Sequence, residues 1–293
     1  MHSPGGRPPP RYLEPILPAW ISHAVLLVVF ALAGTALFFF TVTRGALLWR
    51  GAQGLVAGPA AHVYPIYSNM RLIRLVDVQP LISAILLFQY HRLVSLITAD
   101  LRGLSLRDRQ VLITSCAFGN VIPRVVAAAR GSGARRVLIA DIVDNELEHA
   151  KGKLLAHAGA VRFLEEDATA LTLPDASVAV NVVFFLLHEL PHSQKGEVLR
   201  EAVRVLAPGG KLYLAEFHRP DRRVLRALSW TYFKVFEPFG LALWDTHDPL
   251  RQLEAIGGLR CERHTLFFGN FQVIVAEKDL QPPRGRVAAG EGA

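Results

Sequence analysis

An α/β fold with a mostly parallel sheet is predicted by three features of this 293-residue sequence. From residue 109 onward, short runs rich in valine, isoleucine and leucine alternate with segments of helical composition, a pattern typical of repeated β-α units. Residues 178–187 are almost entirely apolar, as expected of a strand that helices cover on both faces. Near the end of the chain, two β-rich runs flank Gly269-Asn270, which predicts an antiparallel hairpin and therefore a mixed sheet.

The elements of this predicted domain follow in order between residues 109 and 278. Strands are expected at residues 111–115, 136–140, 161–164, 178–187, 211–216, 259–267 and 271–277. Helices are expected at residues 121–130, 145–157 and 193–206, the last with the Ser193 side chain as its N-cap. The segment Ala207-Pro208-Gly209-Gly210 is expected to separate that helix from the next strand.

The apolar segment near the amino terminus predicts attachment to a membrane. Residues 1–18 are rich in proline and glycine and are expected to form a disordered leader. Residues 21–42 carry no charge and are long enough to cross a bilayer, so one transmembrane helix is predicted over residues 19–44; a buried core helix is the alternative. More arginines follow this segment than precede it, which predicts a single-pass inner-membrane protein with its catalytic domain in the cytoplasm.

Residues 45–108 are expected to form a helical lid or a membrane-associated segment. Their apolar run at residues 78–98 contains His91 and Arg92, so it is too interrupted for a second span and suits an interfacial helix. Residues 279–293 contain many small residues and are predicted to be a disordered tail.

The charged residues and the cysteines exclude several kinds of partner. The net charge is +7, but no cluster combines basic with aromatic residues, so nucleic acid is not expected as a ligand and anionic lipid is favoured. Cys116 and Cys261 have no C-x-x-C partner, which argues against a disulfide framework and a zinc site and suits a reducing compartment.

The turn after the first predicted strand is the expected cofactor site, because ligands of open α/β sheets bind beyond the carboxyl ends of the strands. This turn reads Thr114-Ser115-Cys116-Ala117-Phe118-Gly119-Asn120. It lacks the G-x-G-x-x-G pattern of dinucleotide sites, so neither NAD nor FAD is expected. Ser115, Cys116, Phe118 and Gly119 are the candidate binding residues, although Gly119 could also be a simple turn glycine.

Acidic residues follow the second and third predicted strands. Asp141 stands directly after the apolar run VLIA, where a carboxylate can accept both ribose hydroxyls of a nucleoside. Asp144 is the competing residue, or it helps to cap the following helix. Asp167 and Ala168 follow the third strand, where an acid can accept from the exocyclic amine of adenine; a solvated acidic turn is the alternative.

Polar residues also end the fourth and fifth predicted strands, as His188-Glu189 and as Glu216-x-His218. Glu216 and His218 are two residues apart, so an extended backbone directs both to one face. If the two strands are neighbours, the four side chains converge as a general acid and base or as ligands of a divalent ion; alternatively, these strand ends are polar because they meet water. We predict catalytic roles for His188, Glu189 and His218, and metal ligation by Glu216 and His218.

Several stretches of the sequence carry a family resemblance over about residues 62–278. They read VLITSCAFGNVIPRV, VFFLLHELP, LAPGGKLYLAEFHRP, FEPFGLALW and TLFFGNFQVIVA, with a looser match in YPIYSNMRLIRLVDVQPLISAILLF. They resemble class I methyltransferases, particularly the quinone C-methyltransferases of ubiquinone and menaquinone synthesis, and more closely the related rhodoquinone-biosynthesis transferases. PGGKL is common among methyltransferases, whereas LLHE, FHRP and FEPF are more specific.

The resemblance implies a Rossmann-like class I methyltransferase fold, S-adenosylmethionine as cofactor, and a lipid-soluble quinone or another membrane molecule as substrate. The rhodoquinone enzymes are thought to use the cofactor as an amino donor to ubiquinone, helped by a divalent metal such as Mn²⁺. Their cofactor turn carries tyrosine-glycine-aspartate where this chain has Phe118-Gly119-Asn120. A C- or O-methyltransferase of a quinone or lipid is therefore the second hypothesis, and a non-catalytic membrane-bound relative is the third.

Overall fold

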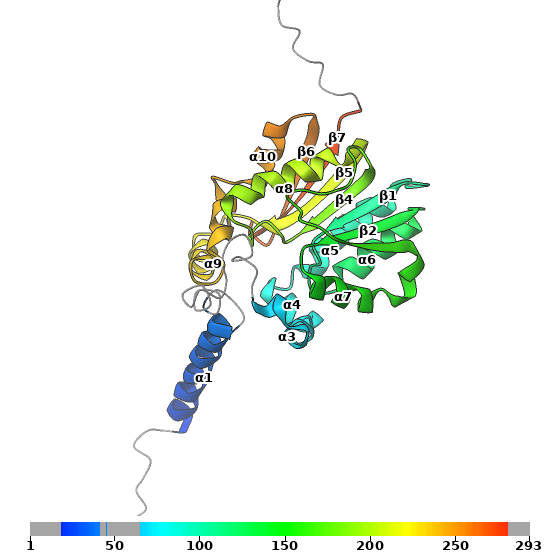
Figure 1. The fold of residues 1–293 in the computed structure, drawn as a ribbon. Coiled ribbons are helices and arrows are strands. Elements are labelled where there is room, and N and C mark those ends of the chain that lie inside the picture. The colour runs from blue at the N-terminus through cyan, green and yellow to red at the C-terminus, as the bar shows by residue number, and fades with distance from the viewer. Residues whose placement is uncertain (1–18, 42–44, 46–64, 281–293) are drawn as a thin grey trace, which may run out of the picture.

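A seven-stranded mixed sheet forms the centre of the structure, a computed structural model that describes residues 19–41, 45 and 65–280 (Figure 1). The strand order is β3-β2-β1-β4-β5-β7-β6. The strands are β1 (Gln110–Thr114), β2 (Arg136–Asp141), β3 (Val161–Glu165), β4 (Val178–Phe184), β5 (Leu206–Phe217), β6 (Leu259–Leu266) and β7 (Phe271–Lys278). Strands β1 to β5 are parallel, and β7 is antiparallel to both β5 and β6. The predicted α/β fold with a C-terminal antiparallel hairpin is confirmed.

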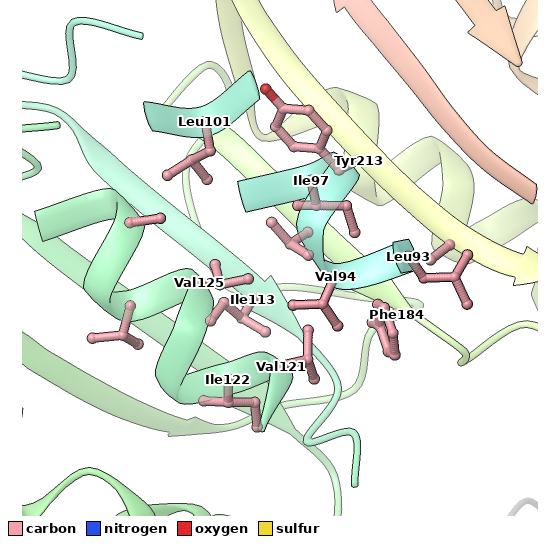
Figure 2. Close-up of a cluster of buried hydrophobic side chains, with 14 of the residues drawn as sticks. Leu93, Val94, Ile97, Leu101, Ile113, Val121, Ile122, Val125, Phe184 and Tyr213 are labelled. Atoms are coloured by element: carbon pink, nitrogen blue, oxygen red, sulfur yellow. The ribbon is translucent and has the colours of Figure 1, made fainter. Parts of the chain in front are cut away.

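Helices cover both faces of this sheet because successive strand residues point to opposite sides. In β1, Val111 and Ile113 belong to one apolar core and Leu112 belongs to the other. The first core also contains residues of α5 (Tyr90–Arg102), α6 (Val121–Gly131) and α7 (Asp144–Lys153); the second contains residues of α8 (His192–Arg204) and α10 (Pro249–Ile256). Figure 2 shows part of the first core, where Leu93, Val94, Ile97 and Leu101 of α5 face Val121, Ile122 and Val125 of α6.

The apolar run at residues 78–98 forms two helices that meet at a sharp bend. The first is α4 (Gln79–Ile85), the second is α5, and Leu87 and Phe88 between them adopt positive φ angles of 49° and 60°. Helix α5 packs its buried face against α6, so this part of the predicted lid belongs to the core of the domain.

The predicted transmembrane segment is helical wherever the structure describes it, as α1 (Ala19–Thr41). Within the described ranges, no single helix is both long and apolar enough to cross a bilayer; the bent pair α4 and α5 meets those two criteria together, with 98° between its helices. Membrane insertion therefore stays a prediction. The leader at residues 1–18 and all but two residues of the predicted tail lie outside the described residues.

The remaining helical segments precede β1 or connect the strands. They are η2 (Pro65–Ser68) and α3 (Met70–Val76) before α4, η3 (Leu155–Ala160) before β3, and α9 (Arg223–Val235) and η4 (Pro238–Trp244) between β5 and α10. Segments η2, α4 and α9 contribute side chains to a single cavity at the carboxyl ends of β1, β4 and β5.

Two predicted helix boundaries differ from the observed ones. The helix expected at residues 145–157 ends at Lys153 and continues as the separate 3-10 segment η3. Helix α8 begins at His192 after Pro191, so Ser193 lies inside its first turn and the predicted Ser193 N-cap is wrong. Pro191 provides no side-chain cap, and its fixed φ already directs the chain into the helix.

Two predicted strand boundaries also differ. Strand β4 ends at Phe184 because Phe185 has a φ of 55°, which turns the chain out of the extended conformation. Strand β5 begins at Leu206, so the glycine-containing segment predicted as a connection lies within the strand. A Cβ on Gly210 would lie 3.0 Å from the Ala179 carbonyl oxygen of the neighbouring strand, and glycine permits this close pairing.

Candidate functional site

The turn after β1 places its backbone close to the end of β2. The Ser115 N–H donates to the Ala140 carbonyl at 2.8 Å, and Ser115 has a φ of 83°, which is unusual for a residue with a side chain. Gly119 has a φ of 82°, and a Cβ there would lie 2.6 Å from the Tyr90 ring. The Tyr90 hydroxyl in turn accepts from the Val121 N–H at 2.6 Å, at the start of α6. Any other residue at position 119 would be strained by the positive φ and would clash with the Tyr90 side chain. Glycine is therefore required here for more than the formation of a turn.

Asp141, the predicted ribose ligand, lies at this turn. One of its carboxylate oxygens accepts from the Cys116 N–H at 2.6 Å and the other accepts from the Val143 N–H at 2.8 Å. Burial raises the pKa of Asp141, opposed by these backbone donors. Asp144, the competing candidate, is exposed at the start of α7. Asp141 thus joins the ends of β1 and β2, and its contact with a ribose stays a prediction.

The predicted adenine-binding residues lie in the loop after β3. The Asp167 side chain is exposed and accepts from both the backbone N–H and the hydroxyl of Thr169, each at 2.8 Å. Ala168 packs at the edge of the core that α8 covers. Neither residue lines the cavity beyond the turn, and their contact with adenine stays a prediction.

A largely apolar cavity of about 190 Å³ opens beside the cofactor turn. Ser115, Cys116 and Phe118 form part of its wall. Its other aromatic lining residues are Tyr67, Tyr90, Phe184, Phe185, Phe217 and Tyr232. Phe185, one of the residues with positive φ, packs edge-on against Phe217 with ring centroids 4.9 Å apart. Strained backbone of this kind concentrates at functional sites, and here it directs an aromatic ring into the cavity wall.

His188 and Glu189 also line the cavity, and the Glu216 carboxylate contacts the His188 ring. The His188 Nδ1 lies 3.0 Å from the Glu216 carboxylate, which is completely buried, and the His188 backbone N–H donates to the same carboxylate at 3.2 Å. The Nε2 atom lies 4.0 Å from the Glu189 carboxylate, which accepts from the Tyr67 hydroxyl at 2.6 Å. These contacts join an imidazole and a carboxylate at one wall of the cavity.

The pKa values of His188 and Glu189 are both raised by this environment, for different reasons. Burial lowers the pKa of His188, but the Glu216 charge and hydrogen bond outweigh it and raise the pKa to about 9. Burial raises the pKa of Glu189, although His188 and the Tyr67 hydroxyl oppose the increase. At neutral pH the imidazole is therefore protonated, and the neighbouring carboxylate is a stronger base than an exposed one.

His218 and Glu216, predicted as metal ligands, have separate partners. The His218 Nδ1 lies 2.7 Å from the Gly269 carbonyl, and its Nε2 lies 3.2 Å from an Arg263 guanidinium nitrogen. Glu216 is occupied by His188 and by the Phe217 N–H at 2.8 Å. Among the described residues, no group of three or more His, Cys, Asp or Glu side chains could hold a metal ion. The divalent-metal prediction therefore has no support, because each ring nitrogen and carboxylate is directed to another partner.

Glu146 of α7 is a cavity residue that the sequence analysis missed. Its side chain lines the cavity and is buried, and burial raises its pKa well above the ordinary value, helped by the negative charges of Asp141 and Glu189. The described part of the chain supplies no hydrogen bond to this carboxylate. A cationic ligand would offset both the energetic cost of burying the Glu146 carboxylate and its repulsion from Asp141 and Glu189. The cavity wall is therefore suited to a positively charged cofactor.

Asp77, between α3 and α4, was also missed, and it holds the cofactor turn from the other side. Its buried carboxylate accepts from the Gly119 N–H, lies 2.6 Å from His149 Nε2, and pairs with Lys153. Lys153 also donates to the Gly119 carbonyl at 2.9 Å. The segment before β1 thus supplies the acid that the turn itself lacks. Asp77, Gly119 and Lys153 are far apart in the sequence and meet only in the folded structure.

Comparisons with known proteins agree with this geometry. The sequence model of the ubiE/COQ5 methyltransferase family matches residues 76–254. The chain belongs to the ubiE/COQ5 methyltransferase family. The ubiquinone/menaquinone biosynthesis C-methyltransferase UbiE of Azotobacter vinelandii is 32% identical over 179 residues, which cover 60% of this chain and 69% of that protein. The enzyme of the same name from Ectopseudomonas mendocina is 31% identical over 179 residues, covering 60% and 68%.

Solved structures show the same fold at lower identity. An exported protein of Bordetella parapertussis superposes with a TM-score of 0.51 at 18% identity, over 64% of this chain and 67% of that one. A protein of Methanococcus maripaludis assigned as an S-adenosyl-L-methionine-dependent methyltransferase gives a TM-score of 0.50 at 14% identity, over 74% and 96%. The chain is thus an S-adenosylmethionine-dependent methyltransferase by family, with a Rossmann-like fold. The buried acids around the turn at Ser115–Gly119 fit the positive charge of that cofactor.

Proposed function

We propose that this ubiE/COQ5 family enzyme methylates a ring carbon of a lipid-soluble quinol. The observation that carries the proposal is the aromatic-lined cavity, which joins the cofactor turn directly to the wall formed by His188 and Glu189. Flat apolar walls suit a quinol ring, and the convergent polar groups suit its hydroxyls. The UbiE relatives are named as C-methyltransferases of ubiquinone and menaquinone biosynthesis, which supports the same choice.

Bound S-adenosylmethionine supplies an electrophilic methyl group, and the residues of this chain prepare the acceptor. The Glu189 carboxylate accepts the proton of a ring hydroxyl, which makes the ring carbon nucleophilic. The protonated His188 stabilises the ring oxygen as it becomes negative, and Glu216 keeps the imidazole charged and oriented. The cofactor, held at the Ser115–Gly119 turn, would supply the methyl group to this ring carbon; the hydrogen on that carbon would leave as a proton to solvent, and Glu189 would return its proton to the ring oxygen.

Labelled cofactor tests this reaction directly. The purified chain is incubated with a short-chain quinol and with S-adenosylmethionine labelled either in its methyl group or in its amino nitrogen. We expect the methyl label in the product. The motifs LLHE and FHRP resemble the rhodoquinone enzymes, for which transfer of the nitrogen would be the outcome. Nitrogen in the product would replace C-methylation by amino transfer, and absence of either label, with the cofactor bound, would favour a non-catalytic relative.

We also propose that the chain is anchored in the inner membrane by α1, with the catalytic domain on the cytoplasmic side. The described part of α1 carries apolar side chains that the structure leaves exposed, from Val25 to Leu37. Burying such a surface in lipid is favourable. Extraction of membranes with alkaline carbonate should leave the full chain in the pellet. Release into the supernatant would contradict the anchor, and protease sensitivity only from the periplasmic side would contradict the orientation.

A further inference from the structure

Helix α9 presents an unusual surface next to the cavity. Its partly buried Tyr232 contributes to the cavity wall, and the Ser229 hydroxyl donates to the Asn270 side chain at 2.8 Å, which attaches the helix to the β6–β7 turn. The outer side carries Val224, Leu228 and Val235, which lie along one stripe at helical spacing. Val224 is 75% exposed and Leu228 is 65% exposed. An apolar stripe that faces away from its own domain requires another partner.

Cationic residues lie beside this apolar stripe. Four arginines occur in the eight residues from Arg219 to Arg226, together with the single acid Asp221. Arg219, Arg223 and Arg226 line an open hollow of about 560 Å³ with Ala227, Trp230, Trp244 and the acid Asp245. No carboxylate of the described chain forms an ion pair with these three arginines. The three arginines outnumber the single acid in this lining, so the hollow is positively charged. Among the described residues, the Arg226 Nε and Trp244 Nε1 atoms have no hydrogen-bond acceptor.

The apolar surface continues on both sides of α9. At the β6–β7 turn, Phe268 is half exposed, and the Arg222 guanidinium lies 5.1 Å from its ring. Across the cavity, Leu81 and Ile85 of α4 line the cavity and are also exposed, and Phe88 at the end of α4 is 75% exposed. Helices α4 and α9, which are far apart in the sequence, thus both contribute residues to the cavity wall, and α4 adds exposed apolar side chains beside it.

We infer that the outer face of α9 docks onto an anionic phospholipid bilayer, with phosphate head groups in the arginine hollow and the stripe Val224-Leu228-Val235 among the acyl chains. Exposed apolar residues together with cationic residues on the same helix are typical of helices that lie in the membrane interface. The charge complementarity selects anionic lipid as the occupant. Because Tyr232 of the same helix lines the cavity, docking places the cavity mouth against the bilayer, where a lipid-soluble ring enters between α4 and α9. This route deepens the proposed function and rests on it.

The test uses the full chain reconstituted in nanodiscs. A spin label is attached at Leu228→Cys in a Cys261→Ser background, with Cys116 left in place because it is buried. A matched label at Arg109→Cys reports on the exposed residue that precedes β1, at the opposite ends of the strands. Collisions with oxygen report lipid, and collisions with a water-soluble nickel chelate report solvent. We expect the label at 228 to contact lipid in nanodiscs that contain phosphatidylglycerol, and the label at 109 to stay in water.

Charge removal tests the hollow separately from the apolar stripe. Each arginine near an anionic surface contributes about 1 kcal/mol, so the double variant Arg219→Gln/Arg223→Gln should shift the ratio of immersed to aqueous label about 30-fold toward water. Nanodiscs of phosphatidylcholine alone should give a similar shift.

Three results would overturn the inference. The label at 228 could remain in water in anionic nanodiscs, or it could be released by inorganic phosphate but not by chloride at equal ionic strength, which would identify a small-anion site. The label at 228 could also be shielded from the nickel chelate to the same extent in lipid-free detergent. If that shielding increased with protein concentration, it would identify a second copy of the chain as the partner. Methyl transfer to a water-soluble quinol, measured on the same preparation, separates failure of docking from failure of the proposed function.

Discussion

Replacing Glu216 by Gln is expected to change how the stability of this enzyme depends on pH. Glu216 is completely buried, and its carboxylate is the main reason that the pKa of His188 rises to about 9. An unfolded histidine titrates near ~6.5, and each pKa unit corresponds to about 1.4 kcal/mol, so the raised pKa represents about 3 kcal/mol of stabilisation. Because the folded pKa is the higher one, this stabilisation is fully present below pH ~6.5 and is lost as the pH rises through about 9.

The Glu216→Gln variant keeps the shape of the side chain and removes its charge. Burial then dominates at His188, its pKa falls, and the imidazole becomes neutral. Denaturant unfolding of the full chain in detergent should show the wild type losing about 3 kcal/mol more than the variant between pH ~6 and pH ~9.5. The imidazole signals in NMR spectra should show the same change in pKa.

A matched control is available in the same protein. Glu262 lies 3.5 Å from His264, and both side chains are largely exposed, so Glu262→Gln should leave the pH dependence of stability unchanged. If wild type and Glu216→Gln give parallel stability curves across this pH range, the buried ion pair does not have the energetic role assigned to it. The proposed stabilisation of the ring oxygen by His188 would then lose its basis.

Three further substitutions test other parts of the site. Glu146→Gln should weaken S-adenosylmethionine binding at least tenfold and weaken S-adenosylhomocysteine less, because loss of a buried charge pair costs at least about 1.4 kcal/mol and the product lacks the sulfonium. Calorimetry checks this, and the exposed Glu148→Gln should change neither affinity. Gly119→Ala should lower the free energy of unfolding by about 1–2 kcal/mol, since its φ is positive and the Tyr90 ring is adjacent; an unchanged melting temperature would refute the reasoning. The buried Lys195 ammonium of α8 donates to the carbonyls of Leu187 and Leu190, which flank His188 and Glu189. Lys195→Met should therefore cost about 1–3 kcal/mol of stability and reduce kcat more than cofactor affinity; equal loss of both would show only a structural role.

The alternation of apolar strands and amphipathic helices was sufficient to predict the sheet and most of its elements. The boundaries that differed have local causes that composition does not reveal. Phe185 ends β4 by adopting a positive φ, although its side chain is as apolar as those of the strand before it. Gly210 lies inside β5 although Pro-Gly-Gly is typical of a turn; a Cβ there would lie 2.7 Å from the Ala207 carbonyl oxygen of the same strand and 3.0 Å from the Ala179 carbonyl oxygen of the neighbouring one.

The sequence by itself determined the fold class, the turn at Ser115–Gly119, and the polar ends of β4 and β5, because these depend on periodicity and on residues close together in the chain. Only the tertiary structure showed that Glu216 is paired with His188 while His218 is directed to Gly269 and Arg263. It also brought Asp77 to the cofactor turn, Tyr67 to Glu189, and Glu146 to the cavity wall. The physical reason is that burial and charge act through space, so the partner that fixes the role of a side chain can lie more than a hundred residues away.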